Sequence, residues 1–298
     1  MVEESDVAAT FAIVDAFFAR QDQLATALTQ PAVSLATGGN APRTVDITPA
    51  PTRPIGSLPV VFWVQILSGA VSAIVSIWVM SLRRGSSAAR LLALAGVGVL
   101  VSAYPAAIYS SREIALPGDL FRVLSAINHL GSFMFGAGMV PLMLSYPACL
   151  VRPRRMWWLP AVLGAFYAAE TFRLLPLGSA ELHHLPVVLM MLAIAVAAVL
   201  QYIKSKHDPV ARAAVRWFGL SVAPGAGTFV LTVLVPPIFA AEPIVSQGYA
   251  FALFAALFLG VAAGVARYRL FDLDRLTLRI LFYFGAVALL LLIDAALI

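Results

Sequence analysis

Long uninterrupted apolar runs make up most of the chain after residue 57. Runs of about 20 apolar residues match the length at which a helix crosses roughly 30 Å of hydrocarbon, whereas strands of a membrane barrel alternate polar and apolar residues. The pattern therefore predicts an all-α integral membrane protein, a bundle of about eight transmembrane helices. The expected spans cover residues 58–82, 88–110, 120–146, 156–174, 185–203, 214–239, 247–266 and 280–298.

Residues 1–57 have a different pattern. Positions 7–28 repeat apolar residues with a helical period, which predicts an amphipathic helix. A short apolar run at 31–35, a turn signal at Gly38-Gly39-Asn40 and alternation over 43–48 follow, and the last of these predicts a strand. We interpret residues 1–57 as a short N-terminal α+β remnant and residues 58–298 as a separate multispan transmembrane domain.

The loops between the expected spans differ sharply in charge. Basic residues gather in every second loop, and short cytoplasmic loops are the ones that carry excess Lys and Arg. The N-terminus is therefore predicted to be extracytoplasmic, in the inner (plasma) membrane of a cell, with the lipid bilayer as a partner. The basic loops contain Arg83, Arg84 and Arg90, then Arg152, Arg154 and Arg155, then Lys204, Lys206, Arg212 and Arg216, and finally Arg267, Arg269, Arg275 and Arg279.

Composition agrees with a membrane protein. The chain is 61% hydrophobic and 12% charged, whereas soluble domains are about 45–50% apolar and about 25% charged. The net charge of +5 comes from the loops, so we expect no nucleic-acid partner. The single Cys149 can form neither a disulfide framework nor a thiolate metal cluster. No catalytic motif is present, and we expect no catalytic residue and no cofactor.

Ionisable and amide side chains near the outer ends of the spans are the candidate site. Such residues are costly in a membrane and mark functional sites. Together they could line an outward-opening pocket, although interfacial positions and a local salt bridge are the simpler explanation. Glu170 and Arg173 are three residues apart and are expected to pair on one helical face. The candidate signal-binding residues are Asn128, His129, Glu170, Arg173, His183 and His184.

Two further patterns have simpler explanations. Glu181, His183 and His184 resemble a metal-ligand set, but adjacent helical residues point in different directions, so we expect no metal. Gly260 and Gly264 fit a small-residue helix-packing motif. Packing within one bundle explains this motif better than dimerisation.

One stretch near the C-terminus resembles a known family. Arg-Tyr-Arg-Leu-Phe-Asp-Leu-Asp-Arg at 267–275, with weaker similarity at 53–69, 104–113 and 127–131, is similar to the membrane sensor region of bacterial two-component histidine kinases of the ComP-like, competence and quorum-sensing type. The resemblance implies that residues 1–57 end a degenerate PDZ-like extracytoplasmic domain. It also implies a cytoplasmic kinase domain, whose phosphoacceptor and ATP-lid motifs are absent from this chain.

The resemblance implies a function in signalling. A peptide or small apolar extracellular signal would bind near His129, Glu170 and His183, and a homodimer would pass the change to a kinase domain and response regulator in a full-length protein. A small multispan transporter or a stand-alone membrane receptor is the alternative, and a scaffold for other helices is a third reading. The expected signal-relay loop contains Arg267, Arg269, Asp272, Asp274 and Arg275.

Overall fold

A computed structural model of the chain describes residues 10–36, 43–50, 52–112, 115–205 and 246–268, with residues 38 and 244 and short pieces between 212 and 238. The described chain is mostly helical and has one two-stranded sheet. Most of the sixth predicted span and all of the eighth lie outside the described residues, so the number of eight spans stays a prediction. Within the described part of the chain, four helices are long and apolar enough to cross a membrane: Val60–Leu82, Ser87–Ser111, Gly118–Ser145 and Glu181–Lys204.

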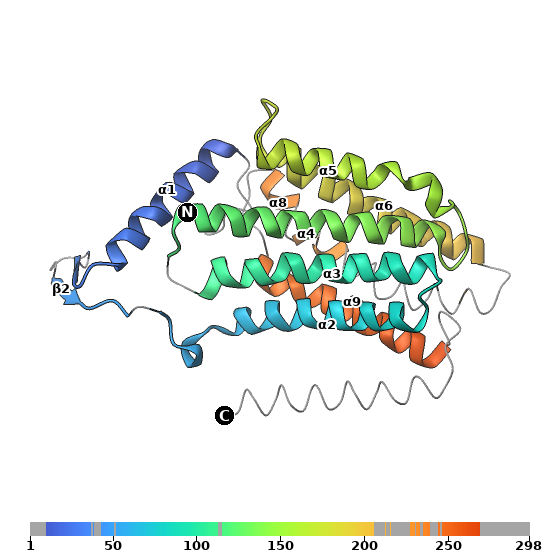
Figure 1. Ribbon diagram of the computed structural model, residues 1–298, viewed down its shortest axis with the longest axis horizontal. Coiled ribbons are helices and arrows are strands. Elements are labelled where there is room, and N and C mark those ends of the chain that lie inside the picture. Colours follow the sequence, from blue (N-terminus) through green and yellow to red (C-terminus); the bar gives the residue numbers. More distant parts are fainter. Residues whose placement is uncertain are drawn as a thin grey trace.

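The long helices lie side by side and alternate in direction (Figure 1). α3 packs between α2 and α4, α4 also contacts α5 and α6, and α9 packs mainly on α2. The connection between α2 and α3 and the connection between α4 and α5 therefore lie at the same end of the bundle. The helices are α2 (Val60–Leu82), α3 (Ser87–Ala107), α4 (Gly118–Ser145), α5 (Trp158–Thr171), α6 (Leu185–Lys204), α8 (Val235–Ile238) and α9 (Gln247–Tyr268).

The N-terminal segment lies at the opposite end of the bundle (Figure 1). The predicted amphipathic helix is α1 (Phe11–Leu28), and Thr10 caps it by accepting a hydrogen bond from the Ile13 N–H. β1 (Val33–Ala36) and β2 (Thr44–Ile47) form an antiparallel pair in which Val33 lies opposite Ile47. The helix and the strand expected at 43–48 are thus confirmed.

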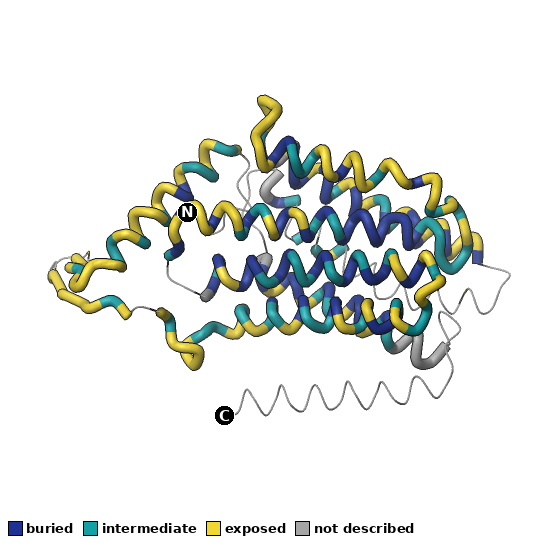
Figure 2. The backbone as a smooth tube through the Cα atoms, in the orientation of Figure 1, coloured by how far each residue is buried: buried dark blue, intermediate teal, exposed yellow. Residues whose placement is uncertain are grey.

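Glycines bring α3 and α4 into backbone contact. A Cβ atom on Gly131 would lie 2.4 Å from the Ser102 nitrogen, and one on Gly98 would lie 2.6 Å from the Phe135 nitrogen. Close approach through small residues is typical of helix packing in membranes. Buried residues concentrate along the inner sides of these two helices (Figure 2). The predicted packing motif at Gly260 and Gly264 lies instead in α9.

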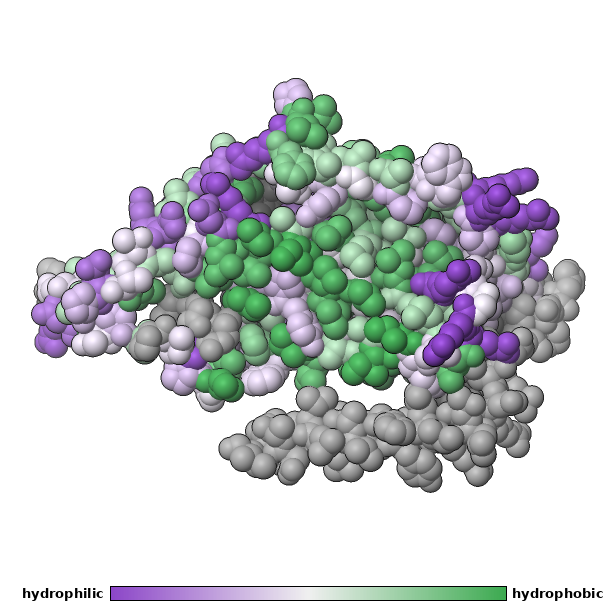
Figure 3. Space-filling model, viewed as in Figure 1, coloured by the Kyte–Doolittle hydropathy of each residue, from purple (hydrophilic) through white to green (hydrophobic). Residues whose placement is uncertain are grey.

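A broad apolar surface covers the middle of the bundle on the face seen in Figure 3. Figure 3 shows hydrophobic side chains across the helices and hydrophilic ones towards the two ends. A soluble protein rarely exposes a contiguous apolar patch of this kind, whereas lipid-facing helices require one. The exposed residues include Val60, Ile74, Leu120, Val123, Leu189, Leu192, Val196, Val199 and Leu259.

Candidate signal-binding pocket

α1 crosses the N-terminal end of α4 and is held there by aromatic packing. Phe17 and Phe18 are buried, and their ring centroids lie 5.2 and 5.3 Å from that of Phe121 in α4. Tyr109 stacks on the other side of Phe121 at 4.8 Å. The Gly118 N–H, at the start of α4, donates to the Asp22 carboxylate of α1 at 2.9 Å. The amphipathic helix is therefore docked on the bundle through its apolar face.

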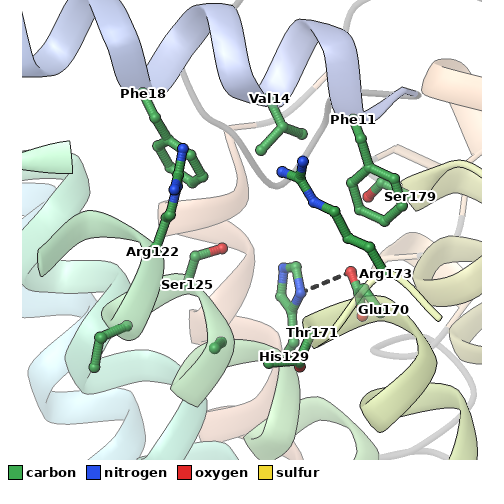
Figure 4. Close-up of a pocket in the computed structure, with 12 residues that line it drawn as sticks. Phe11, Val14, Phe18, Arg122, Ser125, His129, Glu170, Thr171, Arg173 and Ser179 are labelled. Carbon is green, nitrogen blue, oxygen red and sulfur yellow. Dashed lines mark ion pairs between the residues drawn. The ribbon is translucent and has the colours of Figure 1, made fainter. Parts of the chain in front are cut away.

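A pocket of about 320 Å³ lies beneath α1. α1 contributes Phe11, Val14 and Phe18, and mostly polar residues from α4, the end of α5 and the connection that follows line the rest (Figure 4). In this view His129 and Glu170 lie on the side of the pocket away from α1. The pocket therefore has an apolar roof and an ionisable floor.

The two floor residues belong to a cluster of three buried ionisable side chains from three separate elements. The third member, His183, is not itself among the residues that line the pocket. His129 Nδ1 of α4 lies 2.9 Å from one Glu170 oxygen of α5, and His183 Nδ1 lies 3.3 Å from the other. The two imidazole rings stack with centroids 3.9 Å apart, and the Phe133 ring packs against His183. The two contacts compensate the burial of the Glu170 carboxylate, which is only 6% exposed.

A π-helical turn places His183 in this cluster. The turn covers Ala180–His184 and leads directly into α6. The Glu181 carboxylate accepts a hydrogen bond from the Gly178 N–H at 2.9 Å, which fixes the start of the turn. Such π turns are rare and occur frequently at functional sites. Sequence periodicity does not indicate a π turn, so the position of His183 required the structure.

Arg173 pairs with Asp15 of α1, which corrects the expected pairing with Glu170. α5 ends at Thr171, so Arg173 is no longer on the helix and the spacing of three residues does not place it beside Glu170. The Arg173 N–H bonds the Glu170 carbonyl and the Leu174 N–H bonds the Ala169 carbonyl, as in a Schellman cap. Arg173 takes the left-handed conformation of that cap, with φ 52°.

The Arg173 guanidinium then reaches both carboxylate oxygens of Asp15, at 2.8 and 2.5 Å. Arg122 of α4 lies 3.7 Å from the same carboxylate. Arg173 and Arg122 also lie over the rings of Phe11 and Phe18. Asp15 thus connects α1 with two other parts of the bundle, at the rim of the pocket.

Acidification is expected to loosen α1. The Arg173 guanidinium, hydrogen-bonded to Asp15, lowers the pKa of that carboxyl below its ordinary value of 3.8. The ionised Asp15 carboxylate therefore stabilises the docked helix fully at pH values above its ordinary pKa. This stabilisation is lost as the pH falls through the lowered pKa that the carboxyl has in the folded protein. Hydrogen exchange of residues 11–28 should accelerate in this acidic range. The Asp15→Asn variant should exchange faster already at neutral pH and should lack the Asp15-dependent part of the acid response; unchanged exchange in this variant would contradict the docking role.

The other sequence-derived candidates lie outside the cluster or outside the described residues. Asn128 is buried and donates to the Ser102 carbonyl of α3 at 3.0 Å, a helix-to-helix contact. His184 is buried beside His183, with ring centroids 5.8 Å apart. In the expected relay loop, Arg267 belongs to α9, and Arg269, Asp272, Asp274 and Arg275 lie outside the described residues.

No protein-family model, curated protein or solved structure matches this chain.

The geometry adds residues that the sequence analysis did not select. Asp15 and Arg122 contribute to the rim of the pocket. The helical amphipathic pattern of residues 7–28 marks Asp15 only as one residue of a polar face. Gln201 is fully buried in α6, and its amide N–H groups donate to the Met143 carbonyl near the end of α4 and to the Ala148 carbonyl after that helix. Its polar side chain at the end of an apolar span was the available indication.

The structure also brings together a different set of potential metal ligands from the one considered in the sequence. His129, Glu170 and His183 each offer one ligand atom, and these atoms lie within 4.8 Å of one another. Glu181 is exposed and caps the π turn. The difference arises because the three ligands come from separate elements and have no characteristic spacing in the sequence.

Proposed function

We propose that the chain is the membrane sensor module of a bacterial two-component histidine kinase and that the pocket beneath α1 binds its extracellular signal. The observation that carries the proposal is a pocket large enough for a ligand whose floor is formed by His129 and Glu170, two members of the buried cluster that they make with His183. Buried ionisable groups are costly inside a membrane bundle, and a binding site is the common reason for them. The similarity of residues 267–275 to sensor kinases adds the signalling context.

The lining favours a signal with an apolar body and an acidic group. Phe11, Val14 and Phe18 offer apolar surface. Among the described residues, the guanidinium groups of Arg122 and Arg173 share a single carboxylate at the rim, that of Asp15, so these three side chains together carry a net positive charge. A peptide with a free carboxylate or a small apolar acid has this chemistry.

Signal transmission would use the docked helix and α4. α1 is held in place by polar contacts at the exposed rim in addition to the aromatic packing. A ligand that binds more tightly when α1 is in one position therefore shifts the helix towards that position. α4 extends roughly 42 Å, at 1.5 Å per residue over its 28 residues, from the pocket to the opposite end. In a homodimer with an extracytoplasmic N-terminus, the loop at 266–279 would pass the shift to a kinase domain and then a response regulator.

Filling the pocket tests the proposal in cells. Ala126 lines the pocket, whereas Ala252 in α9 is exposed on the outside of the bundle, so Ala126→Trp and Ala252→Trp make the same change at a test and a control position. A strain of the source organism lacking the gene should lose a set of transcripts that depend on cell density. The wild-type chain and Ala252→Trp should restore them, and Ala126→Trp should not. Identical transcripts with and without the gene would refute the sensor function.

A further inference from the structure

We infer that His129, Glu170 and His183 form a binding site for a divalent transition-metal ion, with Zn²⁺ as the reference ion. The inference rests on the proposed function in one respect, because it assigns the chemistry of the floor of the proposed signal pocket. Two imidazoles and one carboxylate are a ligand set that suits zinc and related ions. Three protein ligands leave one position of a tetrahedral ion open.

The spacing of the three side chains is close to what such an ion requires. A tetrahedral ion with bonds of about 2.0–2.1 Å places its ligand atoms roughly 3.3–3.5 Å apart. His129 and His183 lie 2.9 and 3.3 Å from the two different carboxylate oxygens of Glu170, and one ligand atom from each of the three residues lies within 4.8 Å of the others. Small side-chain rotations are therefore sufficient to surround an ion.

The three ligand side chains are buried and have little freedom to move, as is typical of the ligands in a metal site. The three residues are 9%, 6% and 7% exposed, and each comes from a different element: α4, α5 and the π turn before α6. The Glu181 cap and the Phe133 ring limit the movement of His183. Ligands held on rigid elements need little rearrangement when an ion binds.

The open coordination position would face the pocket. His129 and Glu170 both line it, whereas His183 and His184 do not, so the ion would be open to the pocket on the side of the first two ligands. The excess positive charge of Arg122 and Arg173 at the rim favours an anionic fourth ligand. The signal itself could supply this group, so that metal and signal bind next to each other.

Zn²⁺ titration of the purified chain tests the site. The full chain, freed of any histidine tag and of bound metal by chelation, is dialysed in detergent against Zn²⁺ alone. We expect one ion per chain. Because changes around a ligand alone weaken binding 10–100-fold, loss of a ligand in His129→Gln, Glu170→Gln or His183→Gln should weaken it by about 100-fold or more. His184→Gln is the matched control, since this histidine is equally buried in the same turn, and it should retain the affinity.

X-ray absorption of the Zn²⁺-loaded wild-type chain keeps the inference testable if a variant fails to fold. The expected spectrum contains two imidazole ligands and oxygen. Absence of Zn²⁺ uptake by the wild type, a sulfur ligand, fewer than two imidazoles, or an equal loss of affinity in His184→Gln would overturn the site and leave a hydrogen-bonded structural cluster. If the chain binds Zn²⁺ but no density-dependent transcript depends on the gene, the sensor function alone is refuted. If such transcripts depend on the gene but the chain binds no Zn²⁺, the metal site alone is refuted.

Discussion

Replacing Gly131 with leucine is expected to destabilise the bundle severely. A Cβ atom at this position would lie 2.4 Å from the Ser102 nitrogen and 2.5 Å from the Gly98 oxygen, both in the backbone of α3, which cannot rotate away. Overpacking a filled core costs about 1–3 kcal/mol and occasionally more, and we expect at least about 3 kcal/mol here because backbone must move. Thermal unfolding in detergent, followed by circular dichroism, measures the effect.

Gly164→Leu is the matched control for this substitution. Gly164 also lies in a helix, α5, but it is exposed and a Cβ atom there would have no neighbour within 4 Å. This variant should unfold at a temperature close to that of the wild type, because leucine is also a better helix former than glycine. If both variants unfolded alike, backbone contact between α3 and α4 would not be what limits the stability of the bundle.

Labelling of Cys149 is expected to depend completely on access to the cytoplasm. This cysteine is exposed in the connection between α4 and α5, beside the basic residues Arg152, Arg154 and Arg155. Basic loops remain in the cytoplasm, so a membrane-impermeant maleimide should label Cys149 only after the cells are permeabilised. The chain has one cysteine, and therefore the wild type can be used directly.

A position expected on the extracytoplasmic side lies just after the end of α1. Gln30 is exposed beyond that helix, at the opposite end of the bundle. In the Gln30→Cys, Cys149→Ser double variant the same reagent should label intact cells. Labelling of Cys149 in intact cells, together with protection of the cysteine at position 30, would reverse the proposed orientation and place the pocket in the cytoplasm.

Hydrophobic patterning predicted the local elements well. The ends of α2, α3, α4 and α6 lie within a few residues of the predicted spans, because each apolar run ends at charged or helix-breaking residues such as Arg83 and Pro117. α1 and β2 were predicted from periodicity for the same reason. The length of an apolar run and the period of its hydrophobic residues depend only on neighbouring residues, so both can be determined from the sequence alone.

The site could be predicted only in part. The cost of burying charge selected His129, Glu170 and His183 one by one, but their contact depends on how α4, α5 and the π turn pack together. The expected partner of Glu170 was wrong because the Schellman cap directs Arg173 towards Asp15, 158 residues away in the sequence. The close contact at Gly98 and Gly131 is likewise tertiary, since glycines are frequent in membrane helices.

Capture of a ligand by the purified protein tests the central claim most directly. The wild-type chain, Ala126→Trp and Ala252→Trp are incorporated in lipid nanodiscs, incubated with spent culture medium of the source organism and washed, and the retained small molecules are identified by mass spectrometry. We predict that the wild type and Ala252→Trp retain the same molecule, with an apolar body and an acidic group, and that Ala126→Trp does not. Retention of no molecule by the wild type, or of the same molecule by all three proteins, would contradict a signal-binding pocket beneath α1.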